Sequence, residues 1–150
     1  MGSCMKNKKK FHGFSLIEML IVVAIIGIAG AAAYAAYTEQ VSRGMRTEGK
    51  DFILDLAAAQ EAFYAQNLSY ANSITAANQL NRMDTQSANG RYTANLVVAP
   101  GGCAAGVTAC RTYTLSVVPN TVDLDCTSLT YNNAGVVGST GAGTVAECWR

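Results

Sequence analysis

The sequence predicts an α+β protein in which one long N-terminal helix packs on an antiparallel β-sheet of three or four strands. Residues 19–37 contain no charged residue and no proline, and apolar residues then recur at helical spacing as far as Asn67. Beyond residue 91, short runs rich in Val, Thr and Tyr are separated by Pro, Gly and Asn, a pattern typical of strands and turns. A sheet that covers one face of a helix gives the layered arrangement of small α+β domains.

The first part of the helix is long enough to cross a membrane, because about 19 residues at ~1.5 Å per residue match a hydrocarbon core of ~30 Å. A secretory signal peptide would have a small-residue cleavage site after its apolar core, whereas Gly13 here precedes the core. We therefore expect the span to be retained. Four lysines precede it and place the N-terminus in the cytoplasm and the rest of the chain outside: Lys6, Lys8, Lys9 and Lys10.

Glu18 is an acid within this apolar stretch. An ionisable group in a membrane span costs up to a few kcal/mol and usually has a function. The sequence therefore predicts a positively charged partner for Glu18.

The N-terminal residues resemble the class III signal of type IV pilins, which combines Lys9-Lys10 and Gly13 with the run Phe14-Ser15-Leu16-Ile17-Glu18. The resemblance implies that prepilin peptidase cleaves between Gly13 and Phe14 and methylates the new amine of Phe14. The retained helix would then be both a membrane anchor and the core of a filament.

Later segments are similar to PilE-like minor pilins of the type IVa class. These are Arg46-Thr47-Glu48-Gly49, the run at residues 57–61, and the ending Glu147-Cys148-Trp149-Arg150. The resemblance implies the type IV pilin fold and four regions: a leader (1–13), a transmembrane and filament-core helix (14–37), an amphipathic helix half (38–67) and a soluble head domain (68–150) with a disulfide-closed C-terminal loop.

Two glycines, Gly27 and Gly30, lie within the span. Each costs about 1 kcal/mol of helix propensity relative to alanine, so local unwinding is easiest there, although close helix packing explains them equally well. Many pilins have a proline a few residues further on. Ala35 stands in that region here, so a kink of the family's kind is not expected from the sequence.

The amphipathic half of the helix has an apolar face made of Val41, Met45, Phe52, Leu56, Ala59 and Phe63. Residues 68–90 are polar and predict a loop. Strands are expected at residues 92–98, 112–118 and 122–131, with Tyr113, Leu115 and Val117 on one face of the second. Residues 132–135 predict a hairpin turn, and residues 138–143 a flexible glycine-rich loop.

Four cysteines follow the span, an even number in an oxidising compartment, and they predict two disulfides: Cys103, Cys110, Cys126 and Cys148. Cys4 lies in the leader. Three pairings are possible in principle. We favour Cys126 with Cys148, which would fasten a glycine-rich loop that cannot form a core, and Cys103 with Cys110.

The residues provide no catalytic constellation. His12, the only histidine, lies in the leader, so a Ser–His or Cys–His couple and a histidine-ligated zinc are not available after cleavage. Asp123 and Asp125 resemble calcium ligands in spacing, but solvent-facing positions on a strand are the commoner case. We expect no enzyme activity, no metal and no cofactor.

Charge argues against a broad DNA-binding face. From Phe14 onward, seven Lys and Arg stand against ten Asp and Glu, a net charge of −3. Nucleic acid is therefore an unlikely direct specific ligand. The expected partners are other pilin subunits, prepilin peptidase and the pilus assembly machinery, first in the bacterial inner membrane and then in an extracellular pilus.

The preferred function is a minor subunit of a type IV pilus, supporting biogenesis with twitching motility, adhesion or DNA uptake. A major pilin, a type II secretion pseudopilin and a signal-anchored single-pass binding protein are the alternatives. The Glu18 carboxylate would pair with the amine of Phe14, either within one chain or with that of a neighbouring subunit, which would set the axial stagger of the filament. We favour the intermolecular pair.

Overall fold

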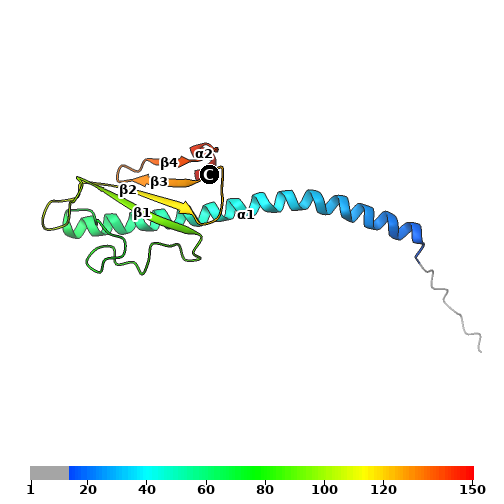
Figure 1. Ribbon diagram of the computed structural model, residues 1–150, viewed down its shortest axis with the longest axis horizontal. Helices are drawn as coiled ribbons and strands as arrows, with labels where there is room; N and C mark the ends of the chain where they lie inside the picture. Colours follow the sequence, from blue (N-terminus) through cyan, green and yellow to red (C-terminus); the bar gives the residue numbers. More distant parts are fainter. Residues whose placement is uncertain (1–13) are drawn as a thin grey trace, which may run out of the picture. The chain divides into compact units, whose positions relative to one another are not determined.

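A computed structural model describes residues 14–150, apart from the side chain at position 35, so the predictions on Cys4, His12, Gly13 and the leader lysines lie outside the described residues. The elements in chain order are α1 (Leu16–Asn67), β1 (Tyr92–Ala99), β2 (Thr112–Pro119), β3 (Ser128–Asn132), β4 (Val137–Thr140) and α2 (Val145–Trp149) (Figure 1). The α+β prediction is confirmed. The chain divides into two compact units, Met1–Glu39 and Gln40–Arg150, and we call the second the globular unit.

The described part of the first unit consists of the apolar turns of α1. An 18-residue window of this helix has a mean hydropathy of 2.5, and none of it is buried within the molecule. Within the described residues, α1 is the helix whose length and composition allow it to cross a membrane. It runs through Gly27 and Gly30 without interruption, and no atom lies within 4 Å of a Cβ built at either glycine. Apolar side chains exposed over such a length require lipid or other proteins around them.

The four strands of the globular unit form one antiparallel sheet in the order β1-β2-β3-β4. Leu115 of β2 lies opposite Leu96 of β1 and Tyr131 of β3. Because side chains alternate along a strand, Tyr113, Leu115 and Val117 all point to one face, and all three are buried, as the sequence predicts.

The face of α1 that joins this core is shifted from the predicted one, of whose six members only Leu56 is buried. Ile53, Leu56, Ala57 and Gln60 are buried, whereas Phe52 is only half-buried and packs at the margin of the core. The helix is therefore in contact with the sheet through positions spaced by three or four residues, which lie on one side of an α-helix.

Gly49 lies at the closest approach of helix and sheet. A Cβ at this position would lie 2.7 Å from the ring of Tyr92, which is itself buried. Glycine lets the aromatic ring of β1 pack directly on the helix backbone. The run Arg46-Thr47-Glu48-Gly49 thus has a packing role in addition to the polar contacts described below.

Two predictions on the C-terminal half need correction, and one helix there was not expected. The predicted strand at residues 122–131 begins only at Ser128, because the Asp123 carboxylate accepts hydrogen bonds from the backbone N–H groups of Asp125 and Cys126 and forms a turn. The predicted flexible loop at residues 138–143 begins with the last residues of β4. The unexpected helix is α2, which starts with a capping box between Thr144 and Glu147.

Candidate functional site

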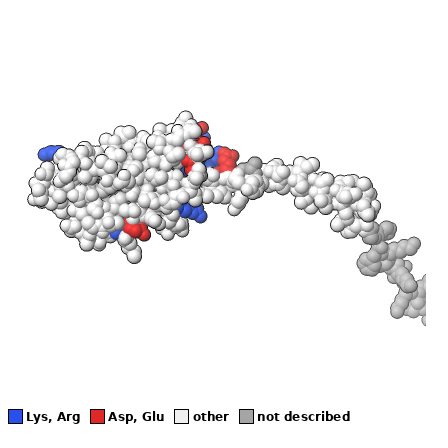
Figure 2. All heavy atoms as spheres, in the orientation of Figure 1, with Lys and Arg blue, Asp and Glu red and all other residues white. Residues whose placement is uncertain are grey.

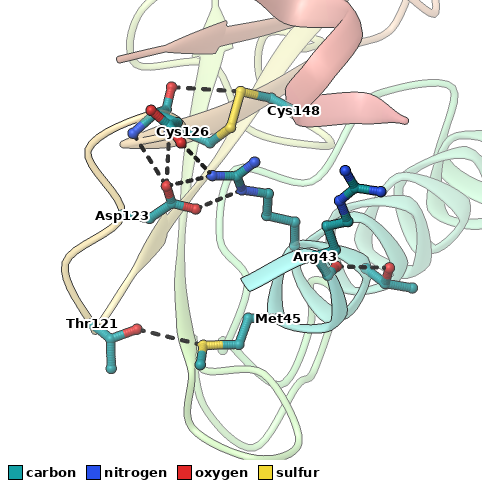
Figure 3. A network of polar contacts seen from close by, with 9 residues as sticks. Arg43, Met45, Thr121, Asp123, Cys126 and Cys148 are labelled. Atoms are coloured by element: carbon teal, nitrogen blue, oxygen red, sulfur yellow. Dashed lines mark hydrogen bonds and ion pairs between the residues drawn. A yellow bond between two sulfur atoms is a disulfide. The ribbon is translucent and has the colours of Figure 1, made fainter. Parts of the chain in front are cut away.

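Figure 3 shows Asp123 of the β2–β3 loop near the Cys126–Cys148 disulfide at one end of the globular unit. Arg46 anchors this loop to α1. Its Nε donates to Asp123 Oδ2 at 2.7 Å, and its Nη2 donates to Asp123 Oδ1 at 2.8 Å and to Asp125 Oδ2 at 3.2 Å. The hydrogen bond from Arg46 lowers the pKa of the Asp123 carboxyl group. Its effect on this pKa is larger than that of partial burial, which acts in the opposite direction. This planar, two-point contact fixes the loop geometrically.

The same contacts exclude the expected solvent-facing position for Asp123, whose side chain is only 16% exposed. The Asp123 carboxylate has its charge compensated by an arginine rather than by a cation from solution. Among the described residues, no cluster of three or more His, Cys, Asp or Glu side chains has the geometry to hold a metal ion. We therefore interpret this end of the unit as a structural junction.

A disulfide reinforces this junction. Cys126 is joined to Cys148, and Cys103 to Cys110, which are the two pairings that we favour from the sequence. Beyond Cys148, the indole Nε1 of Trp149 donates to the Gly138 carbonyl at 2.8 Å. The C-terminal segment is therefore attached to β4 as well as to the β2–β3 loop.

The other end of the globular unit is formed by the β1–β2 loop and the chain that leaves α1 (Figure 1). Tyr70 N donates to the Cys110 carbonyl at 3.0 Å, Cys110 N donates to Ser69 Oγ at 2.8 Å, and Asn72 Nδ2 donates to the Cys103 carbonyl at 2.8 Å. The loop closed by the Cys103–Cys110 disulfide is thus held on both of its sides. We call this end the loop end.

Arg111 follows this disulfide directly and its side chain is exposed. It forms no side-chain hydrogen bond or ion pair with any residue that the structure describes. Arg46, Arg82 and Arg91, by contrast, each pair with a carboxylate of the same molecule. Figure 2 shows a basic group at the far left end of the globular unit with no acidic group beside it on the face in view, whereas the acidic groups on this face lie beside basic ones.

Three tyrosines pack together beside the loop end, of which Tyr70 and Tyr113 are buried and Tyr64 is exposed. The rings of Tyr64 and Tyr70 stack with centroids 4.6 Å apart, and Tyr70 meets Tyr113 edge-on at 4.7 Å. The hydroxyl groups of Tyr70 and Tyr113 donate to the Glu61 carboxylate at 3.5 Å and 3.3 Å. Burial, followed by the charge of Glu61, raises the pKa of Tyr113 well above its ordinary value.

The N-terminal site residues lie in the first unit. Phe14 precedes α1, Glu18 lies in the first turn of that helix, and both are exposed. Cleavage at Gly13, methylation of Phe14 and an assembly role for Glu18 stay predictions. Arg111 and Gln60 were not predicted as site residues, although the position of Arg111 directly after a cysteine is a signal that could have identified it.

Comparison with known proteins adds two matches. The family model described as type IV minor pilin ComP, DNA uptake sequence receptor, matches residues 35–130, more than half of the chain. The prokaryotic N-terminal methylation motif matches residues 8–34. A search of curated proteins finds no match. The two family matches cover adjoining parts of the chain, and together with the fold they identify it as a member of the ComP family of type IV minor pilins, a subunit anchored in the membrane before it enters an extracellular pilus.

Proposed function

We propose that this minor pilin binds double-stranded DNA directly at the loop end of its globular unit and so acts in DNA uptake. The observation that carries the proposal is Arg111, an exposed guanidinium without an acidic partner among the described residues, next to a disulfide-fixed loop. Arginine is well suited to phosphate oxygens and to base edges because it offers several donors in a fixed plane. The role is one of structure and binding rather than catalysis.

The distribution of acidic residues supports this location despite the net charge of −3. No Asp or Glu occurs at residues 62–83 or 85–122, which include β1, β2 and the loop between them. A phosphate backbone that approaches the loop end therefore meets little fixed negative charge from these segments. The expectation that nucleic acid is an unlikely ligand rested on total charge, which does not reveal where the acids lie. The family's description as a DNA uptake sequence receptor also stands against it.

Binding of a fluorescent duplex to the mature chain in detergent micelles, measured by anisotropy over a range of salt concentrations, tests the proposal. We expect Arg111→Ala to weaken binding and to reduce the slope of log K against log salt by about 1, the value for one lost phosphate contact. Arg82→Ala is the matched control, since it removes the same charge from a guanidinium that already pairs with Asp55. Equal affinity and equal slope for Arg111→Ala and the wild type would refute the assignment.

Sequence specificity requires a separate measurement. Selection from a pool of duplexes with a randomised centre should enrich a common motif if the subunit reads an uptake sequence. A pool that stays random after repeated selection, with intact non-specific binding, would leave general DNA binding in place and eliminate the receptor role.

We also propose that prepilin peptidase removes residues 1–13 and that the amine of Phe14 is methylated. The match to the N-terminal methylation motif at residues 8–34 supports this. The intact mass of the membrane-extracted protein should correspond to a chain that starts at Phe14 and carries one methyl group. A mass that retains the leader lysines, or that lacks the apolar helix, would contradict the proposal.

Glu18, we further propose, pairs with the Phe14 amine of a neighbouring subunit during assembly. The first unit leaves both residues exposed, so they are accessible to a partner. Glu18→Ala should leave cleavage and membrane insertion intact and reduce the amount of the subunit in sheared pili, while Glu18→Gln separates the effect of charge from that of shape. An unchanged ratio of Glu18→Ala subunits to the other pilins would show that the carboxylate is not needed.

A further inference from the structure

A groove of about 660 Å³ runs along the globular unit between α1 and the segment at residues 82–89. On the helix side it follows a single face, which includes Gly44, Asp51 and Phe52. On the other side it is bordered by Met83 and Asp84. It belongs neither to the loop end nor to the junction around Arg46.

The walls of this groove are partly apolar and open to a partner. The side chain of Met83 is fully exposed, and Phe52 is only half-buried. No atom lies within 4 Å of a Cβ built on Gly44, so a side chain from outside can approach the helix backbone there. An exposed methionine adapts its shape readily to an apolar surface, which makes it a common contact residue in protein interfaces.

The groove is also preformed. Ser87 Oγ donates to Glu48 Oε1 at 2.6 Å, and Asn89 Nδ2 donates to Glu48 Oε2 at 3.1 Å. These bonds hold the segment at residues 82–89 against α1 at a fixed distance. Docking of a partner here therefore requires little loss of conformational entropy in the groove walls.

The charge of the groove is predominantly negative. Four carboxylates contribute to its lining, and the single guanidinium among the lining residues, that of Arg82, pairs with Asp55 at 2.7 Å. Asp51 forms no ion pair with a described residue, and Asp84 bonds only to the backbone N–H of Gln86. Asp51 and Asp84 thus leave uncompensated charge on opposite sides of the groove, and this charge is complementary to a lysine or arginine.

We propose that this groove docks a neighbouring pilin of a different kind, which inserts a lysine or arginine together with an adjacent aliphatic side chain. The aliphatic group would contact Met83 and Phe52, and the cation would lie between Asp51 and Asp84. A different pilin is the expected occupant because most neighbours of a minor subunit in a filament are other pilins. The proposal rests on membership of the pilin family and is independent of DNA binding at the loop end.

Photo-crosslinking in piliated cells tests the occupant. Benzoylphenylalanine replaces Met83, and the crosslinked species are identified by mass spectrometry. The control carries benzoylphenylalanine in place of Val97, an exposed residue of β1 outside the groove. We expect a crosslink from position 83 to another pilin, close to a basic residue. Crosslinking to pilins no stronger than from position 97, or only to a second copy of this chain, would overturn the proposal.

Charge reversal tests the chemistry. Asp51→Arg should lower the ratio of this subunit to the other pilins in sheared filaments by about tenfold, as expected for like charges brought together at an interface. Asp51→Asn should have a smaller effect, and Thr114→Lys, which adds one positive charge at an exposed position of β2, should have none. Unchanged fluorescence of Trp149 and unchanged duplex binding would show that the variant is folded.

Replacement of the crosslinked partner's cation by glutamate should restore the Asp51→Arg subunit to the filament. Wild-type incorporation of Asp51→Arg would refute the docking role of the groove. Failure of duplex binding by the wild-type protein would refute the proposed DNA function alone and leave this inference standing.

Discussion

Gln60 offers the sharpest test of how the loop after α1 is held. Its side chain is fully buried, its Nε2 donates to the Ala71 carbonyl at 3.0 Å, and its Oε1 accepts from the Ala71 N–H at 2.9 Å. One amide thus satisfies both backbone groups of a residue that is also fully buried. In the Gln60→Leu variant the volume is largely kept, but neither backbone group has a partner.

The expected loss follows from these two groups. An unsatisfied buried N–H or C=O costs roughly 1–3 kcal/mol, so two of them cost roughly 2–6 kcal/mol. Leucine recovers part of this through its apolar surface, which is worth about 1 kcal/mol or somewhat more. We therefore expect Gln60→Leu to lower the free energy of unfolding of the globular unit by about 2–4 kcal/mol, a large share of the ~5–15 kcal/mol typical of a domain.

Urea unfolding of the mature chain in detergent micelles, followed by the fluorescence of Trp149, the only tryptophan, measures this loss. The matched control is Gln66→Leu, the same substitution at an exposed position of α1, for which we expect a change within about 0.5 kcal/mol. If Gln60→Leu were as stable as Gln66→Leu, the two hydrogen bonds to Ala71 would not hold the loop and the reasoning would fail.

Three further predictions concern charge and cross-linking. Because Arg46 lowers the pKa of Asp123 in the folded state, their contact stabilises the protein above about pH 4, the ordinary pKa of Asp, and is lost as the pH falls further. Asp123→Asn should be less stable than the wild type at pH 7, and its stability should depend less on pH in the acid range. An acid limb identical to that of the wild type would contradict this prediction. Burial of Tyr113 raises its pKa, so the contribution of this residue to stability is present below about pH 10 and declines above it. Tyr113→Phe should therefore remove part of the alkaline loss of stability measured by fluorescence. An alkaline limb identical to that of the wild type would count against the burial of this hydroxyl group. Loss of the Cys126–Cys148 disulfide, which spans 22 residues, should cost about 3 kcal/mol, more than loss of the shorter Cys103–Cys110 bond, and the reverse order in urea unfolding of the two double alanine variants would disprove it.

The sequence by itself determined the membrane helix, the class of the fold and the family. An uncharged apolar run needs no partner residue to be recognised, because its length and composition already match a bilayer. The alternation that assigns Tyr113, Leu115 and Val117 to one face of β2 is equally local, since successive side chains of any strand point to opposite sides. Both properties follow from backbone geometry, and both are found in the structure.

Tertiary structure decided how distant polar groups are used. Asp123 lies 77 positions from Arg46, and only the packing of the β2–β3 loop on α1 brings this predicted strand residue into a half-buried ion pair. Gln60 is buried because the loop at Ala71, 11 positions further along the chain, folds back onto its side-chain amide. The absence of acids from β1 and β2 can be read in the sequence, but only the fold shows that Arg46, Arg82 and Arg91 pair with acids whereas Arg111 does not. Ion pairs and hydrogen bonds form between groups that lie close together in space. Neither the composition nor the periodicity of the sequence shows which distant groups these are.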